Sequence, residues 1–127
     1  MRRGRRTLLA LLAPIALVAA ACGDDDASGG SSNPDAALQV VATTTVTADF
    51  VGIIGGDRVG VYSVAKPNVD LHDYEPSPAD LNAMKRAQVI VRNGLGLESW
   101  LDDTLTSSGT KAAVIDSSEG VTPREGG

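Results

Sequence analysis

The sequence has few of the residues on which several kinds of site depend. Its 127 residues contain one cysteine, one histidine and four aromatic side chains. One cysteine excludes an internal disulfide framework and a zinc cluster built from cysteines. One histidine excludes a multi-histidine metal site formed by this chain alone, since a zinc site takes about four ligands. The scarcity of aromatic residues argues against a stacking platform for bases.

Basic residues are also scarce outside the N-terminus. The chain has 11 basic and 16 acidic residues, and four of the basic ones lie within the first six positions. From Cys22 onward, 16 acidic residues face seven basic ones. Nucleic-acid phosphates require a basic face on the protein. The charge therefore excludes nucleic acid as a partner.

The N-terminus has the pattern of an export signal. A cationic stretch, 1–7, precedes an almost wholly apolar stretch, 8–18, and three alanines then lead to Cys22. This order of n-region, h-region and small-residue cleavage site is typical of a signal peptide, which we place at residues 1–21. The apolar stretch is about half the length of a membrane-spanning helix. Arg5-Arg6 leaves twin-arginine export open beside the general secretory route.

Cys22 changes the prediction from a secreted to an anchored protein. The segment Val18-Ala19-Ala20-Ala21-Cys22 resembles a bacterial lipobox, although Ala19 stands where leucine is more usual. In a lipobox the cysteine thiol is diacylated, and two acyl chains hold a protein firmly on a membrane. Residues 22–37 are small, polar and acidic, which is typical of a flexible tether. We expect an exported protein on the outer face of the cytoplasmic membrane.

From Leu38 onward, the sequence alternates between strand and helix patterns. Four short β-branched runs alternate with three amphipathic segments. The predicted strands are 38–43, 59–64, 88–92 and 112–115, and the predicted helices are 44–54, 77–87 and 97–106. This alternation predicts an α/β fold with a parallel sheet and flanking helices in residues 38–127. Ligands bind such sheets at the carboxyl ends of the strands.

Two local patterns support the helix assignments. Val46, Phe50, Val51 and Ile54 recur at helical spacing in the first helix. Ser77 is a natural N-cap before Pro78, and Asp80 can complete a capping box with it.

The single histidine lies in the longest of the predicted loops, 65–76. His72 has three carboxylates within three residues of it, and prolines stand near both ends of the loop. A neutral imidazole is a common metal ligand. From the residues alone, a surface histidine without a role and a metal ligand both remain open.

Several segments together resemble one protein family. Val40-Val41-Ala42-Thr43-Thr44, the segment 70–81 with its His72-Asp73-Tyr74-Glu75-Pro76 core, and the turn 93–101 occur in the order seen in metal-binding receptors of bacterial ABC importers for zinc and manganese. These are the cluster A-I solute-binding lipoproteins. The resemblance covers about residues 40–116, and Leu71 departs from it because proline is frequent there in the family.

The resemblance implies both a fold and a function. It implies the first lobe of a two-lobed periplasmic-binding-type receptor, here as a truncated N-terminal lobe, with His72 as a direct metal ligand. It also implies a monomer that delivers zinc or manganese to an ABC importer permease and its ATPase, and that catalyses no reaction. The family's second histidine and the ligands of its second lobe are not in this sequence.

Two other functions remain as alternatives. Gly94-Leu95-Gly96 follows a predicted strand, and Asp116 ends the next strand, which imitates the dinucleotide fingerprint of an exported oxidoreductase. The third glycine of that fingerprint is replaced by Ser99. An adhesin or a structural lipoprotein is the other alternative. The sequence also contains nothing that resembles a nucleophile paired with a base, so hydrolysis has no support.

Overall fold

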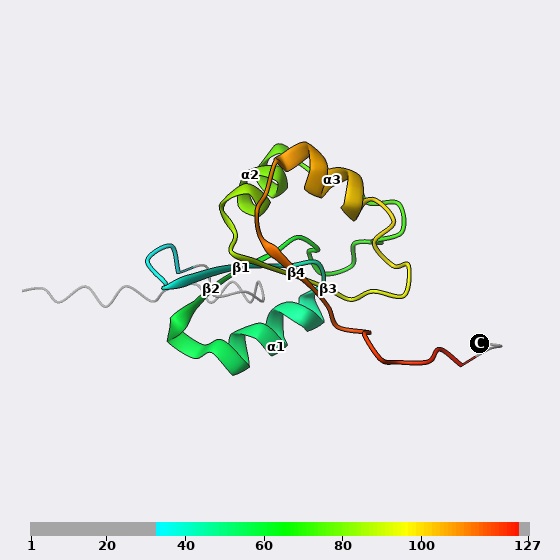
Figure 1. Cartoon of the computed structure of the whole chain (residues 1–127), viewed down its shortest axis with the longest axis horizontal. Coiled ribbons are helices and arrows are strands. Elements are labelled where there is room, and N and C mark those ends of the chain that lie inside the picture. The colour runs from blue at the N-terminus through cyan, green and yellow to red at the C-terminus, as the bar shows by residue number, and fades with distance from the viewer. Residues whose placement is uncertain (1–32, 125–127) are drawn as a thin grey trace, which may run out of the picture.

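A computed structural model describes residues 33–124, which form three layers (Figure 1). Helices α2 and α3 lie on one face of a four-stranded sheet, and α1 lies on the other. The elements are β1 (Leu38–Ala42), α1 (Thr45–Gly55), the 3-10 turn η1 (Gly56–Arg58), β2 (Val59–Ser63), α2 (Pro78–Arg86), β3 (Val89–Arg92), α3 (Leu101–Ser108) and β4 (Ala113–Asp116). The predicted α/β fold with a parallel sheet is confirmed.

All strand pairs are parallel, in the order β2-β1-β3-β4. After β1, the chain forms β2 on one side of β1, and it then crosses over to form β3 on the other side of β1. A crevice forms at such a switch point, at the carboxyl ends of the strands. The loops that follow β1, β2 and β3 meet at this edge.

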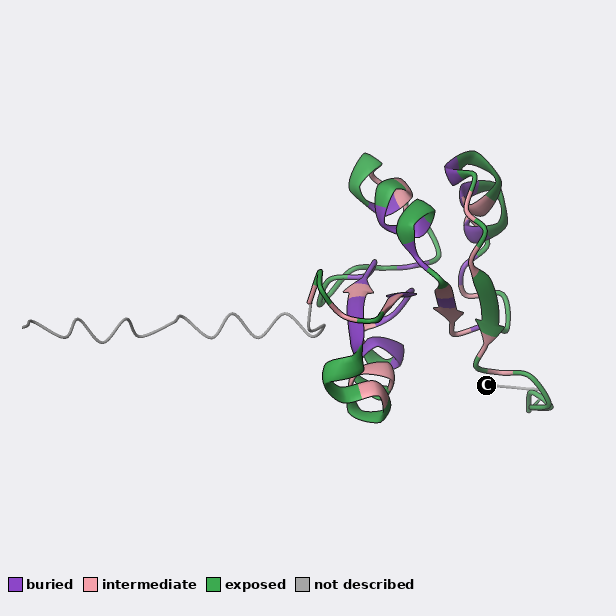
Figure 2. Ribbon diagram, turned by 60° about the vertical axis from the view of Figure 1, so that its left-hand side comes forward, coloured by how far each residue is buried: buried purple, intermediate pink, exposed green. Residues whose placement is uncertain are grey.

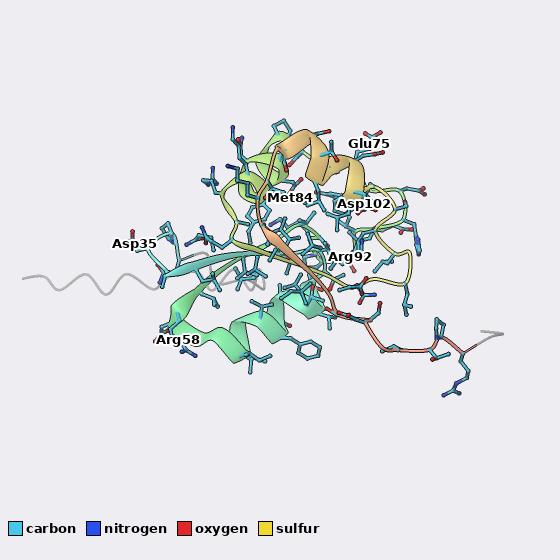
Figure 3. All side chains as sticks on the ribbon, viewed as in Figure 1. Asp35, Arg58, Glu75, Met84, Arg92 and Asp102 are labelled. Atoms are coloured by element: carbon cyan, nitrogen blue, oxygen red, sulfur yellow. The ribbon has the colours of Figure 1, made fainter. Side chains whose placement is uncertain are left out.

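The core has two parts, one on each face of the sheet. Met84, Ile90 and Leu101 have no exposed surface and pack with Val41 on the α2–α3 side. Figure 3 shows Met84 between those helices and the sheet. Val40, Ala42 and Ala48 form the smaller cluster under α1. No helix among residues 33–124 is long and apolar enough to cross a membrane.

Helix α1 forms where predicted, but of its four predicted apolar positions only Val51 packs, partly buried, against the core. It begins with a capping box in which Thr44 and Thr47 exchange side-chain and backbone bonds. Thr47 and Ala48 are buried against the sheet, whereas Phe50 is 59% and Ile54 81% exposed. Small side chains let the helix lie close to β1 and β2, and Figure 2 shows that much of the α1 ribbon is exposed.

Helix α3 begins four residues later than the predicted Leu97. Gly94, Leu95 and Gly96 all have positive φ angles, and residues 95–100 form successive turns. A right-handed helix cannot include those three positions, and the turns over residues 97–100 then precede α3. The helix ends at Gly109, which adopts the left-handed conformation that glycine tolerates.

Candidate metal-binding site

His72 lies in the loop between β2 and α2, at the carboxyl edge of the sheet. Just after β2, the chain makes two further hydrogen bonds to the end of β1. The Val64 N–H donates to the Ala42 carbonyl (2.9 Å), and the Ala65 N–H donates to the Thr43 carbonyl (3.1 Å). His72 itself is exposed, whereas the preceding Leu71 is 7% exposed and packs inward. The structure therefore presents His72 to solvent in the loop that follows β2.

The backbone around His72 is held by its neighbours. The Asp70 carboxylate accepts the His72 N–H at 2.9 Å, which is a typical Asx turn. The Trp100 indole Nε1–H donates to the Leu71 carbonyl at 2.9 Å. The Trp100 ring also packs on Tyr74, with ring centroids 5.2 Å apart and planes tilted by 56°. The sequence gives no local sign of this role for Trp100, because Trp100 and Leu71 lie 29 positions apart.

The loop ends at a buried carboxylate. Asp80 is 2% exposed and accepts bonds from the Tyr62 hydroxyl (2.8 Å), the Tyr74 hydroxyl (2.9 Å), and the Ser77 N–H (2.7 Å) and hydroxyl (2.6 Å). Ser77 Oγ in turn accepts the Asp80 N–H. The predicted capping box at the start of α2 is confirmed. The two tyrosines add a link from β2 and from the loop to the same carboxylate.

This cluster shifts the pKa values of its members. Burial raises the pKa of Asp80, but the bonds from Ser77 and the two tyrosines outweigh it and hold that pKa below its usual range. Burial, with the adjacent carboxylate, raises the pKa of Tyr62 and of Tyr74 to about 12.

These shifts predict how stability depends on pH. A tyrosine whose pKa rises on folding stabilises the fold below its unfolded pKa of about 10, and this stabilisation is lost as pH rises toward 12. We therefore expect the urea midpoint to fall between pH 10 and 12, and to fall less in Tyr62→Phe. An equally steep fall in that variant would contradict the assignment. Asp80, whose pKa is lowered, loses its stabilisation at acid pH.

The carboxylates near His72 in sequence do not gather around it. Asp70, Asp73 and Glu75 are exposed, and Glu75 points outward from the domain (Figure 3). Residues 33–124 contain no group of three or more histidine, cysteine, aspartate or glutamate side chains that could hold a metal ion. Of the predicted site residues, the structure thus shows His72 as a single accessible imidazole. Cys22 lies outside the described residues.

The neighbouring turn is closed by another buried carboxylate, which sequence reasoning missed. Glu98 is 7% exposed and accepts the Thr43 hydroxyl (2.5 Å), the Asn93 N–H (2.8 Å) and the Gly94 N–H (3.1 Å). It links the ends of β1 and β3. A glutamate six residues after a strand gives no local signal for such a distant bond.

The same bonds remove the basis for the dinucleotide alternative. The amides of Asn93 and Gly94, which would face a pyrophosphate, already donate to Glu98, and no helix begins at this turn. Gly94 is required by Asp116: a Cβ there would lie 2.0 Å from its Oδ1. Asp116 is itself engaged by Arg92 Nε (2.9 Å) and by Ser118.

Most of the described chain matches known proteins. Residues 40–127 match the family described as zinc-uptake complex component A, periplasmic. The iron-binding protein YfeA of Yersinia pestis is 37% identical over 92 residues, which are 69% of this chain and 29% of YfeA. The metal ABC transporter substrate-binding lipoprotein ScbA of Streptococcus cristatus is 35% identical over 99 residues, 78% of this chain and 31% of ScbA.

A solved structure agrees with this match. The crystal structure of a ZnuA deletion mutant with zinc bound superposes with a TM-score of 0.66 at 35% identity, and covers 70% of this chain and 34% of that one. The chain thus spans about a third of the length of the proteins that it matches.

Proposed function

The chain belongs to the family of the periplasmic zinc-uptake component A, and from this premise we propose that it captures a divalent transition metal outside the cytoplasm for delivery to an ABC importer. The metal is the cargo, zinc or manganese, and the chain catalyses no reaction. The observation that carries the proposal is the exposed His72 on an anchored loop at the switch point of a parallel sheet.

We assign the role of metal ligand to His72. A neutral imidazole suits zinc, copper, iron and nickel, whereas carboxylates suit magnesium, calcium and manganese. One imidazole does not fill the four positions of a zinc site. Residues 33–124 contain no group of three or more ligating side chains that could hold a metal ion. The proposal therefore requires further ligands from outside these residues.

The proposed partners are an importer permease with its ATPase. The name of ScbA, a metal ABC transporter substrate-binding lipoprotein, supports this proposal. We propose that the receptor acts as a monomer. The adhesin and structural-lipoprotein alternatives have no observation in residues 33–124 that favours them.

The proposal is tested by titrating the full chain with Zn²⁺ and Mn²⁺ and following the imidazole resonances of His72 by NMR. Since the chain has one histidine, these resonances are assigned without ambiguity. We expect a saturable shift with Zn²⁺ at one metal per chain, and selective broadening of the same resonances with paramagnetic Mn²⁺. Resonances that stay unchanged while metal binds elsewhere would overturn the proposed site.

The anchor is a separate part of the proposal. We propose that residues 1–21 are removed as a signal peptide, that Cys22 carries the lipid, and that residues 22–37 act as a tether. At the N-terminal end of the described residues, the side-chain amide of Gln39 donates to three of the carbonyls of residues 33–36.

Replacing Cys22 by alanine is expected to move the protein from the membrane fraction to the soluble fraction or to leave the signal peptide uncleaved. Each buried methylene of an acyl chain stabilises membrane binding by about 0.8 kcal/mol, so losing two chains abolishes it. Fractionation and the intact mass measure this result. Ser32→Ala, ten residues further along, is the matched control and should stay membrane-bound. A fully processed, membrane-bound Cys22→Ala protein would contradict the anchor.

A further inference from the structure

We propose that Trp100 is a positioning residue for His72: it holds the backbone on both sides of the imidazole in the arrangement that binds metal. The inference rests on the proposed function and deepens it, because it assigns a role to a residue that need not touch the metal. It concerns the loop 65–77 and the turn 93–100 that packs against it.

The two contacts of Trp100 bracket His72. Its indole N–H donates to the carbonyl of Leu71, one residue before His72, and its ring packs on Tyr74, two residues after it. One side chain, from an element that is distant in sequence, therefore fixes both flanks of the candidate ligand. The local bond from Asp70 to the His72 N–H fixes the turn itself, but it does not attach the loop to the domain.

Trp100 is held in turn by the core. The next residue, Leu101, has no exposed surface, and the Trp100 carbonyl accepts the Thr104 hydroxyl (2.8 Å) and N–H (3.2 Å) at the start of α3. The contact from Trp100 thus connects the His72 loop to a rigid helix. Leu71 is itself buried.

A loop that is already ordered loses less conformational entropy when its ligand binds. Ligating groups must also be held within a fraction of an ångström of the productive geometry. Removing the indole N–H leaves the half-buried Leu71 carbonyl without this donor. The loop then samples other conformations, in which the imidazole is displaced from the other ligands.

The test uses Trp100→Phe, which keeps an aromatic ring beside Tyr74 and removes the N–H. A hydrogen bond of ordinary net strength corresponds to about a fivefold change in an equilibrium constant. We expect the Zn²⁺ dissociation constant of the full chain, from NMR of His72, to rise about fivefold. Amide exchange at His72 should quicken, while exchange at Val41 in the core should change less.

Tyr62→Phe is the matched control. It removes a hydroxyl bond to Asp80 from β2, outside the loop, so it lowers stability without releasing His72. We expect its Zn²⁺ dissociation constant to stay within about twofold of the parent. Equal effects of Trp100→Phe and Tyr62→Phe on zinc binding would overturn the positioning role.

A second substitution covers the case in which Trp100→Phe does not fold. Because the chain has one tryptophan, growth on benzothienylalanine replaces Trp100 alone and puts sulfur in place of the N–H at nearly the same volume. The same fivefold weakening is expected, and unchanged binding would overturn the proposal. His72→Ala separates the two claims: if it binds zinc as the parent does, the proposed function fails, whatever Trp100 does.

Discussion

Replacing His72 by alanine is expected to weaken Zn²⁺ and Mn²⁺ binding by more than about 100-fold. Substitutions of residues that merely support a metal ligand cost 10- to 100-fold in affinity, and loss of the ligand itself should exceed that. Stability should hardly change, because His72 is exposed and its backbone N–H bond to Asp70 survives the substitution. Competition titration gives the affinity, and urea unfolding gives the stability.

Glu75→Gln is the control for this experiment. Glu75 is exposed and lies three residues from His72, so the substitution removes one negative charge from the same loop. If general attraction of cations to an acidic surface explained binding, Glu75→Gln would weaken it, and His72→Ala, which removes no negative charge, would not. Metal affinity of His72→Ala within about threefold of the parent would contradict the assignment of His72 as ligand.

Replacing Asp80 by alanine is expected to destabilise the domain by about 3 kcal/mol or more. Four donor bonds from Tyr62, Tyr74 and Ser77 converge on this buried carboxylate. Hydrogen bonds to a charged group each stabilise by about 1.5–3 kcal/mol, and each donor left buried without an acceptor adds a cost. The loss also removes half of the capping box of α2. Urea unfolding of the full chain measures the change.

Asp49→Ala is the matched control for Asp80. Asp49 lies on the exposed side of α1, where substitutions usually change stability by less than about 0.5 kcal/mol. We also expect Asp80→Ala to loosen the His72 loop, because Tyr74 loses its acceptor. A destabilisation of Asp80→Ala as small as that of Asp49→Ala would show that the cluster does not hold α2 and the loop in place.

The fold was largely predictable from local patterns. The β-branched runs at 38–43 and 59–64 and the Ser77–Asp80 capping box predicted strands and a helix start that the structure confirms. The predicted ends of helices were less accurate where the backbone conformation of a turn determines them. Leu95 has a positive φ, which no propensity for a leucine at that position would suggest, and turns over residues 95–100 precede α3, which begins at Leu101.

The candidate site was predictable only as far as its single histidine. His72 was identified because it lies in the longest loop within a recognisable segment. The residues that hold the loop were not, since Trp100 reaches Leu71 across 29 positions and Glu98 reaches Thr43 across 55. Such contacts follow from the crossover that places β3 beside β1, and a sequence read along the chain contains no local sign of them.

The central claim is that this protein supplies cells with a transition metal through His72. The most direct measurement is the cell-associated zinc and manganese content of the source organism under metal limitation, with His72→Ala at the native locus and Glu75→Gln as control. We predict that one of the two metals falls in the His72→Ala strain and is unchanged in the control. Equal contents of both metals in all strains, with normal amounts of the variant protein, would contradict the claim.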